Sequence, residues 1–488
     1  MFSLFLFALL AVSVGAVPEC QGTLVFNPPQ NISSVTWYPS NFSTDSPPVF
    51  PDNFTCEYQI NVPQGLFVFI ELTLNITSFQ NESAPIQVID QLGKIEDVFS
   101  ARTEWFFFVA PGGKMKLSTG KSKVKFGFTL QWQPLPEIYQ KIIQINKTDT
   151  RPFVWRSYGS EARIITTYNR VSATIIPPPF KSYREMYRGI IFFDGLSWNM
   201  TSLGTGLQLI DEKTQYVSSK QMMTVMYLKP STYSAQTIFQ DYTNTKNIVQ
   251  FQGLRLNGAD DFAVINLNAI HGPAALQTYY MDAVITSING TGRLYAYLGG
   301  VTVNRTNLIA SYDAENCENY LPQAFFGLSK TFVLENGVAM LNISQNIYSD
   351  FAPTKNFGRK GFVATNNYKI ESENQNVRVQ IIAPSNTSTG VFKYSIQSAD
   401  LVPGAKLQIS SVSNSHSSFS ALYYDSSSLP DLNVTNEIVG NQFYVTYSSS
   451  NHINKGFYMD FEIVEHSSAS SQISLFVVFT FMSFLMMY

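Results

Sequence analysis

The segment KVKFGFTLQW, residues 123–132, alternates between apolar and polar or small side chains along its whole length. Successive side chains of a β-strand point to opposite faces of the sheet, so a period of two predicts a half-buried strand. The side chains that we expect to face a core are Val124, Phe126, Phe128, Leu130 and Trp132.

The residues just before this segment follow the same pattern. Met115 and Leu117 alternate with lysines, and the stretch STGKS that follows has the composition of a turn. We therefore predict a β-hairpin over residues 114–132.

A third alternating stretch is IELTLNIT, residues 70–77. Ile70, Leu72 and Leu74 fall on the side that we expect to be buried, and Thr73 and Asn75 fall on the polar side.

The far end of the chain repeats this design. Residues 440–464 contain a glycine-led strand, a serine-rich turn and a second alternating strand, as residues 112–132 do. The similarity predicts another hairpin and an internal duplication. Short strands with turns between them precede it, and their inward positions are Val377, Val379, Ile381, Phe392, Tyr394, Ile396, Leu407 and Ile409.

Regular short strands indicate an all-β protein made of sandwiches or barrels. Strand-like segments also fill the centre of the chain, for example RLYAYLGGVTV, NIVQFQGL and YYMDAVITSI. Amphipathic helices are scarce, and the best candidate lies around residues 136–145.

The composition excludes some classes of function. Only 14% of the 488 residues are charged and the net charge is −3, so there is no basic surface of the kind that nucleic-acid binding requires. Aromatic residues make up 14% of the chain, and much of this set falls on the inward strand positions.

The N-terminus has the pattern of a secretory signal peptide over residues 1–16. An apolar run from Phe2 to Val12 is followed by small residues, with cleavage expected after Ala16. The alternative is a buried N-terminal strand or helix, but no amphipathic pattern or cap accompanies the run.

The C-terminal residues 467–488 begin with small residues and end on an uncharged apolar run, Ile473 to Tyr488. A membrane-spanning helix would need about 20 apolar residues and usually has basic flanks, and a terminal strand would be shorter. Small residues before a terminal apolar tail are typical of a GPI-anchor signal, although the polar spacer is short. We expect such a signal, with Ser468 as the attachment site.

Twelve Asn-x-Ser/Thr sequons are consistent with passage through the secretory pathway and with a glycosylated surface. The expected acceptors are Asn31, Asn41, Asn53, Asn75, Asn81, Asn146, Asn199, Asn289, Asn304, Asn342, Asn386 and Asn433.

The chain contains three cysteines. Cys20 and Cys56 form the economical pair for a disulfide, because both lie near the N-terminus. Cys317 is then either a buried small apolar residue, which we favour, or a link to another chain.

Residues 18–134 resemble the nematode CUB-like domain family. The motifs that carry the resemblance are, in order, CQG at Cys20, TWYPSN, PPVFPDNFTCEYQINVPQG, QVIDQLGK, FFFVAPGG, KLSTG and KFGFTLQW. The resemblance implies a jelly-roll β-sandwich in a secreted or surface protein, and a role in pathogen or stress responses. The closing segment of the chain resembles the end of a CUB domain, which implies a second copy.

The expected organisation follows from these segments. We predict CUB-like jelly-roll β-sandwich domains at both ends, residues 17–134 and 351–466. Between them we expect a strand-rich central region, residues 135–350, which could hold a further divergent domain. Many CUB domains bind calcium, but the ligand set of that family does not map onto this chain. Asp90 and Asp97 are acidic candidates that we expect to be solvated surface groups.

Catalytic motifs of the familiar kinds are missing from the sequence, so we expect no enzyme, no cofactor and no metal site. The four histidines, His271, His416, His452 and His466, are scattered. A dyad of His271 with Asp260 or Asp261 leaves a divergent hydrolase as a remote alternative.

We favour a binding protein of innate immune defence or the stress response, because loops and faces of rigid sandwiches commonly carry recognition. The unknown ligand would be a protein or a glycan. WFFFV, residues 105–109, and the tyrosine pairs 279–280 and 423–424 are candidate stacking surfaces, with core packing as the alternative. The other candidate is a structural glycoprotein of the cell-surface coat without a specific ligand.

The predicted lipid anchor is directly testable. Treatment of cells with a phosphatidylinositol-specific phospholipase should release the protein from the outer face of the plasma membrane, because the enzyme cuts the lipid from the anchor. Retention on the membrane after treatment would contradict the anchor and favour a spanning helix.

Overall fold

The computed structural model describes residues 20–466, except residues 21, 41, 77–82, 100, 139–141, 158, 198, 200, 230–234, 259, 385–388, 414–417 and 450. The predicted signal peptide and anchor signal lie outside the described residues. So do Ser468, His416 and the acceptors Asn41, Asn81 and Asn386.

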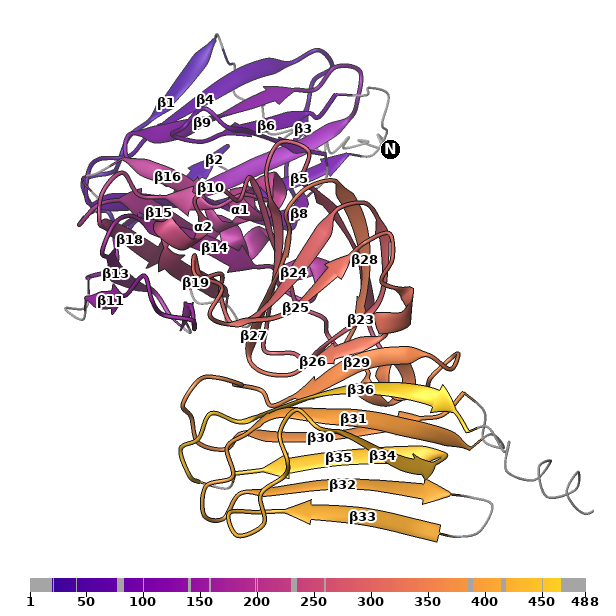
Figure 1. The fold of residues 1–488 in the computed structure, drawn as a ribbon. Helices are drawn as coiled ribbons and strands as arrows, with labels where there is room; N and C mark the ends of the chain where they lie inside the picture. Colours follow the sequence, from indigo (N-terminus) through magenta and orange to yellow (C-terminus); the bar gives the residue numbers. More distant parts are fainter. Residues whose placement is uncertain are drawn as a thin grey trace, which may run out of the picture.

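In this described part the chain forms eight β-sheets, which pair into four sandwiches that we call units 1 to 4 (Figure 1). The all-β architecture predicted from strand alternation is confirmed. The apolar side chains of each unit fill the space between its two sheets.

Unit 1 combines the sheet β1-β4-β9-β6-β7 with the sheet β2-β10-β5-β8, and β3 also pairs with β10. Its strands are β1 (Thr23–Phe26), β2 (Thr36–Tyr38), β3 (Val49–Phe50), β4 (Thr55–Asn61), β5 (Leu66–Ile76), β6 (Ile86–Ile89), β7 (Ile95–Val98), β8 (Ala101–Val109), β9 (Gly112–Ser118) and β10 (Val124–Pro134).

Unit 2 combines the sheets β11-β13-β18-β15-β16 and β12-β19-β14-β17. Its elements are β11 (Ile143–Ile145), β12 (Phe153–Arg156), β13 (Glu161–Thr167), β14 (Val171–Ile176), η1 (Lys181–Tyr183), η2 (Glu185–Gly189), β15 (Ile190–Asp194), β16 (Ser202–Thr205), α1 (Gly206–Glu212), β17 (Tyr216–Val217), β18 (Met222–Tyr227), β19 (Gln236–Asp241) and α2 (Tyr242–Thr245).

Unit 3 combines the sheets β20-β22-β27-β24-β25 and β21-β28-β23-β26. Its elements are β20 (Gln250–Leu254), β21 (Phe262–Asn268), β22 (Ala274–Tyr279), β23 (Ala283–Gly290), β24 (Arg293–Leu298), β25 (Leu308–Asp313), η3 (Glu318–Tyr320), β26 (Gln323–Phe325), β27 (Ser329–Leu334), β28 (Val338–Ser344) and η4 (Ile347–Phe351).

Unit 4 combines the sheets β29-β36-β31-β34 and β30-β35-β32-β33. Its strands are β29 (Arg359–Ala364), β30 (Asn376–Ile382), β31 (Gly390–Ala399), β32 (Lys406–Ser413), β33 (Ser418–Tyr424), β34 (Thr435–Gly440), β35 (Gln442–Ser448) and β36 (Phe457–Glu465).

All four units share one strand order. With the two-residue β3 set aside, units 1 to 3 each have nine strands in the orders 1-3-8-5-6 and 2-9-4-7, counted within the unit. In each, the first strand pairs in parallel with the third. Unit 4 keeps both orders without the first strand, and a single parallel bridge between Pro353 and Ile382 lies at the position of that strand. The central region is therefore two sandwiches of the same topology.

The predicted pairing of the two hairpins is wrong, although their strands and inward faces are correct. β9 and β10 belong to opposite sheets of unit 1, and β35 and β36 to opposite sheets of unit 4. The two strands of each pair face one another across the core instead of lying side by side. Alternation shows which side of a strand is buried, but it does not show which neighbour provides the hydrogen bonds.

The structure departs from the sequence-based prediction in two further places. Residues 143–145 form strand β11 where we expected part of a helix. Thr73 is buried on the predicted polar face of β5 because it pairs with Gly127, and the Phe42 ring packs on Gly127.

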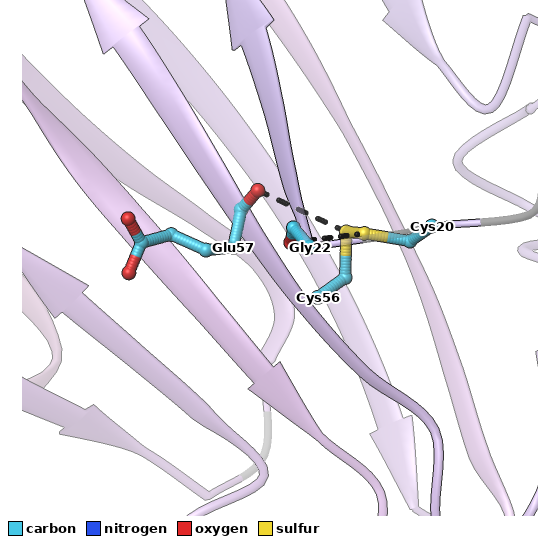
Figure 2. Close-up of a disulfide and its surroundings, with 4 residues drawn as sticks. All are labelled: Cys20, Gly22, Cys56 and Glu57. Carbon is cyan, nitrogen blue, oxygen red and sulfur yellow. Dashed lines mark hydrogen bonds between the residues drawn. A yellow bond between two sulfur atoms is a disulfide. The ribbon is translucent and has the colours of Figure 1, made fainter.

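The disulfide between Cys20 and Cys56 is present, with the two Cα atoms 5.7 Å apart. It ties the start of the chain to β4, beside the parallel pairing of β1 with β4. Figure 2 shows the sulfur atoms against the backbone oxygens of Gly22 and Glu57, at 3.4 and 3.8 Å. These are contacts, because a disulfide has no proton to donate. Cys317 is only 2% exposed in the core of unit 3, as a buried small apolar residue would be.

The two faces of the WFFFV segment, residues 105–109, explain how units 1 and 2 join. In β8, Phe106 and Phe108 face the core of unit 1, whereas Phe107 and Val109 pack in a separate apolar cluster. That cluster contains Ala162, Ile191, Phe193, Met226 and Leu228 of unit 2.

An ion cluster lies beside this apolar contact. The buried Arg188 of unit 2 donates to Glu96 and, at 2.9 Å, to Glu104 of unit 1, and its guanidinium lies 4.0 Å from the ring centroid of Phe106. Burial raises the pKa of Glu104, and the positive charge of Arg188 offsets part of this rise.

Removal of the disulfide should destabilise unit 1. Replacement of Cys20 and Cys56 together by alanine frees a loop with a sequence separation of 36 residues, which is worth about 3–4 kcal/mol in the chain-entropy model. Denaturant unfolding of the two proteins measures the difference, and Cys317→Ala is the matched single-thiol control. An unchanged midpoint in the double variant would contradict a stabilising bond.

Loss of Arg188 should weaken the junction of units 1 and 2. Arg188→Met leaves Glu96 and Glu104 without their cation, and we expect a cost of about 2–3 kcal/mol, less than for a fully buried pair because Glu96 is partly solvated. Lys393→Met, which breaks an exposed pair with Glu437, is the control and should change the free energy of unfolding by less than about 0.5 kcal/mol.

Glu104 should also make stability depend on pH. A carboxyl whose pKa is higher in the folded than in the unfolded chain destabilises the fold at neutral pH, and this cost disappears below about pH 4. Glu104→Gln should remove this contribution, so its stability relative to the wild type should be highest at neutral pH and fall on acidification. A difference independent of pH would refute the assignment.

Candidate functional site

The outer face of the sheet β30-β35-β32-β33 carries the aromatic residues that best fit a binding surface. We call it the terminal face, because unit 4 lies at the opposite end of the molecule from unit 1 (Figure 1). Its outward side chains include Arg378, Gln380, Lys406, Gln408, Val412, Phe419, Tyr423, Gln442, Tyr444 and Thr446.

Strand alternation generates this face directly. Leu407 and Ile409 of β32 are buried in the core, so Gln408 between them points outward, directly opposite Tyr423 in the register of β32 and β33. Phe419 and Tyr423, on the same side of the edge strand β33, are 61% and 64% exposed.

Hydrogen bonds hold the polar groups of the terminal face in place. Gln380 donates to the hydroxyl of Tyr444 at 3.0 Å, and that hydroxyl donates to Gln442 at 2.6 Å. Gln408 donates to the hydroxyl of Tyr423 at 3.4 Å. The face therefore presents aromatic rings beside fixed amides, which can both donate and accept hydrogen bonds.

The four strands of the terminal face contain no carboxylate and no sequon, whereas β23 and β28 in unit 3 each carry a sequon asparagine. A ligand on the terminal face would meet neither acidic repulsion nor a glycan attached to these strands.

The second candidate surface is concave and lies at the junction of units 3 and 4, and we call it the junction groove. It has a volume of about 990 Å³. Its floor is the outer face of β21, β28 and β23, and its walls are formed by residues 318–322 and by the segment 346–359 that leads into unit 4.

The junction groove is polar at its rim and apolar at part of its floor. Asp260, Glu318 and Asp350 supply carboxylates, whereas Phe262 and Val264 are 75% and 50% exposed. The buried Arg359 also lines the groove and donates to the backbone oxygens of Pro322 and Pro353. Burial lowers the pKa of Arg359 to about 9, so the guanidinium keeps its charge at neutral pH.

The other predicted stacking residues are buried or half-buried, or have a cation against one face of the ring. Phe106, Phe107 and Phe108 are buried in the core or against unit 2. The ammonium group of Lys229 lies 3.6 Å from the ring centroid of Trp105, and the guanidinium of Arg156 lies 4.8 Å from that of Tyr280. Of the predicted aromatic sets, Tyr280 and Tyr423 keep exposed rings, at 58% and 64%, and Tyr423 is the one that lies on the terminal face.

The acidic and histidine candidates that the structure describes do not combine into a reactive site. Asp90 accepts hydrogen bonds from Leu92, Lys94 and Gln208, and Asp97 accepts one from Gln87. Among the described residues no group of three or more His, Cys, Asp or Glu side chains could hold a metal ion.

Strand β21 separates Asp260 and Asp261 from His271. Seven strand residues lie between them, which corresponds to roughly 20 Å or more at about 3.3 Å per residue. The carboxylate of Asp261 instead accepts hydrogen bonds from the backbone of Asn257 and Gly258. The histidine and the acids are therefore too far apart for a dyad.

Lys330 is a buried cation that we assign to the fold. Burial lowers its pKa to about 8, and its ammonium group donates to the backbone oxygens of Met281 and Gly327. The ammonium group thus donates to backbone carbonyls in turns of unit 3, and Lys330 lines neither the junction groove nor the terminal face.

The sequence could have located only part of these features. The pair Tyr423–Tyr424 was visible as a run of aromatics, but the amides of the terminal face come from β30, β32 and β35 and gave no local motif. The junction groove combines two units and was not predicted.

No helix in the described residues is long and apolar enough to cross a membrane.

Comparisons with known proteins agree with the fold. Residues 16–136 match the family described as CUB-like domain. Residues 144–228 and 243–346 match two families described as domains of unknown function, DUF7592 and DUF7591. No curated protein matches the chain.

Among solved structures, the chain is similar to the CUB1-EGF-CUB2 domains of rat MASP-1, with 11% identity, a TM-score of 0.16, and coverage of 66% of this chain and 100% of that one. It is also similar to a protein of the lipid-containing bacteriophage PM2, with 10% identity, a TM-score of 0.13 and coverage of 65% and 87%. A triple jelly-roll protein of an archaeal virus has 8% identity, a TM-score of 0.10 and coverage of 85% of each chain. TM-scores this low carry no argument about function.

No catalytic family is among the matching families. A CUB-like domain is typical of extracellular proteins of the binding type. Residues 16–136 are therefore a CUB-like domain, and three more sandwiches of the same strand order follow it.

Proposed function

We propose that this protein is a non-enzymatic glycoprotein of the extracellular face of the plasma membrane that binds a glycan through the terminal face. The observation that carries the proposal is the exposed ring of Tyr423 beside hydrogen-bonded amides, on a sheet whose four strands contain no carboxylate and no sequon. A sugar ring has an apolar C–H face and a rim of hydroxyls, which match the aromatic ring and the amides.

The extracellular location is supported by the positions of the sequons. Eight described acceptors are exposed, and all of them can carry a bulky glycan without a clash in a core: Asn31, Asn53, Asn75, Asn146, Asn199, Asn289, Asn304 and Asn433. The disulfide is likewise typical of proteins that fold in an oxidising compartment.

The biological setting that we propose, innate defence or stress response, rests on the resemblance to the nematode CUB-like family. In that setting the ligand would be a glycan of a microbial surface, and the lipid anchor would hold the protein where such surfaces arrive.

A binding screen should test the terminal face. The ectodomain, residues 17–466, is applied to a glycan array and to fixed bacterial and fungal cells. Tyr423→Ala and Phe419→Ala should each weaken capture at least tenfold, because they remove exposed rings that contribute nothing to the core.

The matched control is Tyr168→Ala, which removes a ring that is 70% exposed in unit 2. It should leave capture unchanged. Equal loss in the control and the terminal-face variants would refute the site, and the absence of capture by the wild type would favour a structural coat protein.

A further inference from the structure

Asn342 differs from the other described sequon asparagines because it is half-buried, in the floor of the junction groove. It lies on β28, the strand between β21 and β23, opposite Val264 on one side and Ser287 on the other. Its side-chain amide donates to the hydroxyl of Ser287 at 2.7 Å. An asparagine that carries a glycan keeps one amide N–H, so this hydrogen bond is compatible with glycosylation.

The floor around Asn342 contains exposed apolar side chains and buried polar atoms without hydrogen-bond partners. The neighbouring Phe262 and Val264 expose large apolar side chains on the outer face of a sheet. Ser344, the hydroxyl residue of the same sequon, is only 4% exposed, and its hydroxyl has no hydrogen-bond partner in the described structure. The Nε of Arg359, also at the groove, is buried without a partner.

Polar groups line the junction groove around this apolar floor. Asn319, Asn346 and Asn356 supply amides, and Asp260 and Asp350 supply carboxylates. Amides and carboxylates accept hydrogen bonds from hydroxyls, while an aromatic ring and a valine can contact the C–H face of a sugar. The groove thus has the chemistry of a saccharide site, and two sequon asparagines line it, the exposed Asn289 and the half-buried Asn342.

We propose that the junction groove is occupied by the chain's own N-glycan, attached to Asn342, whose first sugars cover Phe262 and Val264. This inference rests on the proposed extracellular location. In the attachment, the Asn342 side-chain nitrogen forms a bond to C1 of an oligosaccharide carried on a lipid diphosphate. The bond from C1 to the diphosphate breaks, the lipid diphosphate leaves, and the nitrogen loses one proton.

The glycan would occupy the space between units 3 and 4 and contact both of them. The groove has its floor on unit 3 and part of its wall on the segment that leads into unit 4, so sugars in it contact both sides of the junction. Removal of these sugars exposes apolar surface that nothing else in the described structure covers.

The first test measures occupancy and accessibility on the full chain secreted by eukaryotic cells. Glycopeptide mass spectrometry should find Asn342 occupied. A peptide N-glycanase should release this glycan from the native protein at least tenfold more slowly than the glycan of Asn304, which lies exposed in the loop between β24 and β25. Denaturation should abolish the difference.

The second test removes the glycan without disturbing the packing. Ser344→Ala destroys the sequon and deletes a buried hydroxyl that has no partner, so the fold loses no hydrogen bond. We expect the unfolding midpoint to fall by about 2–4 °C and the binding of an apolar dye to rise. Ser344→Thr keeps the sequon and should preserve occupancy and dye exclusion, and Asn304→Gln should change neither midpoint nor dye binding.

The outcomes separate this inference from the proposed function. If no sequon is occupied, the extracellular assignment fails. If other sequons are occupied but Asn342 is not, or if its glycan is released as fast as that of Asn304, the groove is not filled by the chain's own glycan and this inference is overturned. An Asn342 glycan whose loss changes neither midpoint nor dye binding would also overturn it.

Discussion

Each sheet of this protein buries one face in its own sandwich, and the rest of the structure depends on what covers the other face. Strand alternation provides one apolar side, which the partner sheet covers. In the described residues the outer face of a sheet has one of three environments. It packs on another unit, it lines the junction groove, or it faces solvent as the terminal face does.

The contact of units 1 and 2 is an outer sheet face that packs on another unit. The segment 105–109 of β8 is apolar on both sides, so Phe106 and Phe108 pack in the core of unit 1 while Phe107 and Val109 pack at the interface with unit 2. Burial of this surface takes Arg188 and much of Glu104 out of water, whereas Glu96 stays partly solvated. Their mutual attraction offsets part of the desolvation cost, and the raised pKa of Glu104 is the part that remains.

The two candidate surfaces are the outer face that lines the junction groove and the outer face that is exposed to solvent. The junction groove combines exposed apolar side chains with a sequon in its floor, which is why we assign it to the protein's own sugar. The terminal face combines exposed rings with fixed amides and has no sequon, which is why we assign it to a ligand. Both assignments follow from side chains that alternate outward on strands whose inward residues fill a core.

The sequence by itself determined the strands and their buried sides, since alternation over residues 70–77, 114–132 and 440–464 is a local property of the chain. It also indicated the cysteine pair and the resemblance of the first and last segments. Tertiary structure alone decided which strands pair. β9 and β10 are close in sequence yet face one another across a core, because two amphipathic strands can bury their apolar sides in this way as well as side by side. The amides around Tyr423 and the groove floor around Asn342 come from strands far apart in sequence, so only the folded sheets bring them together.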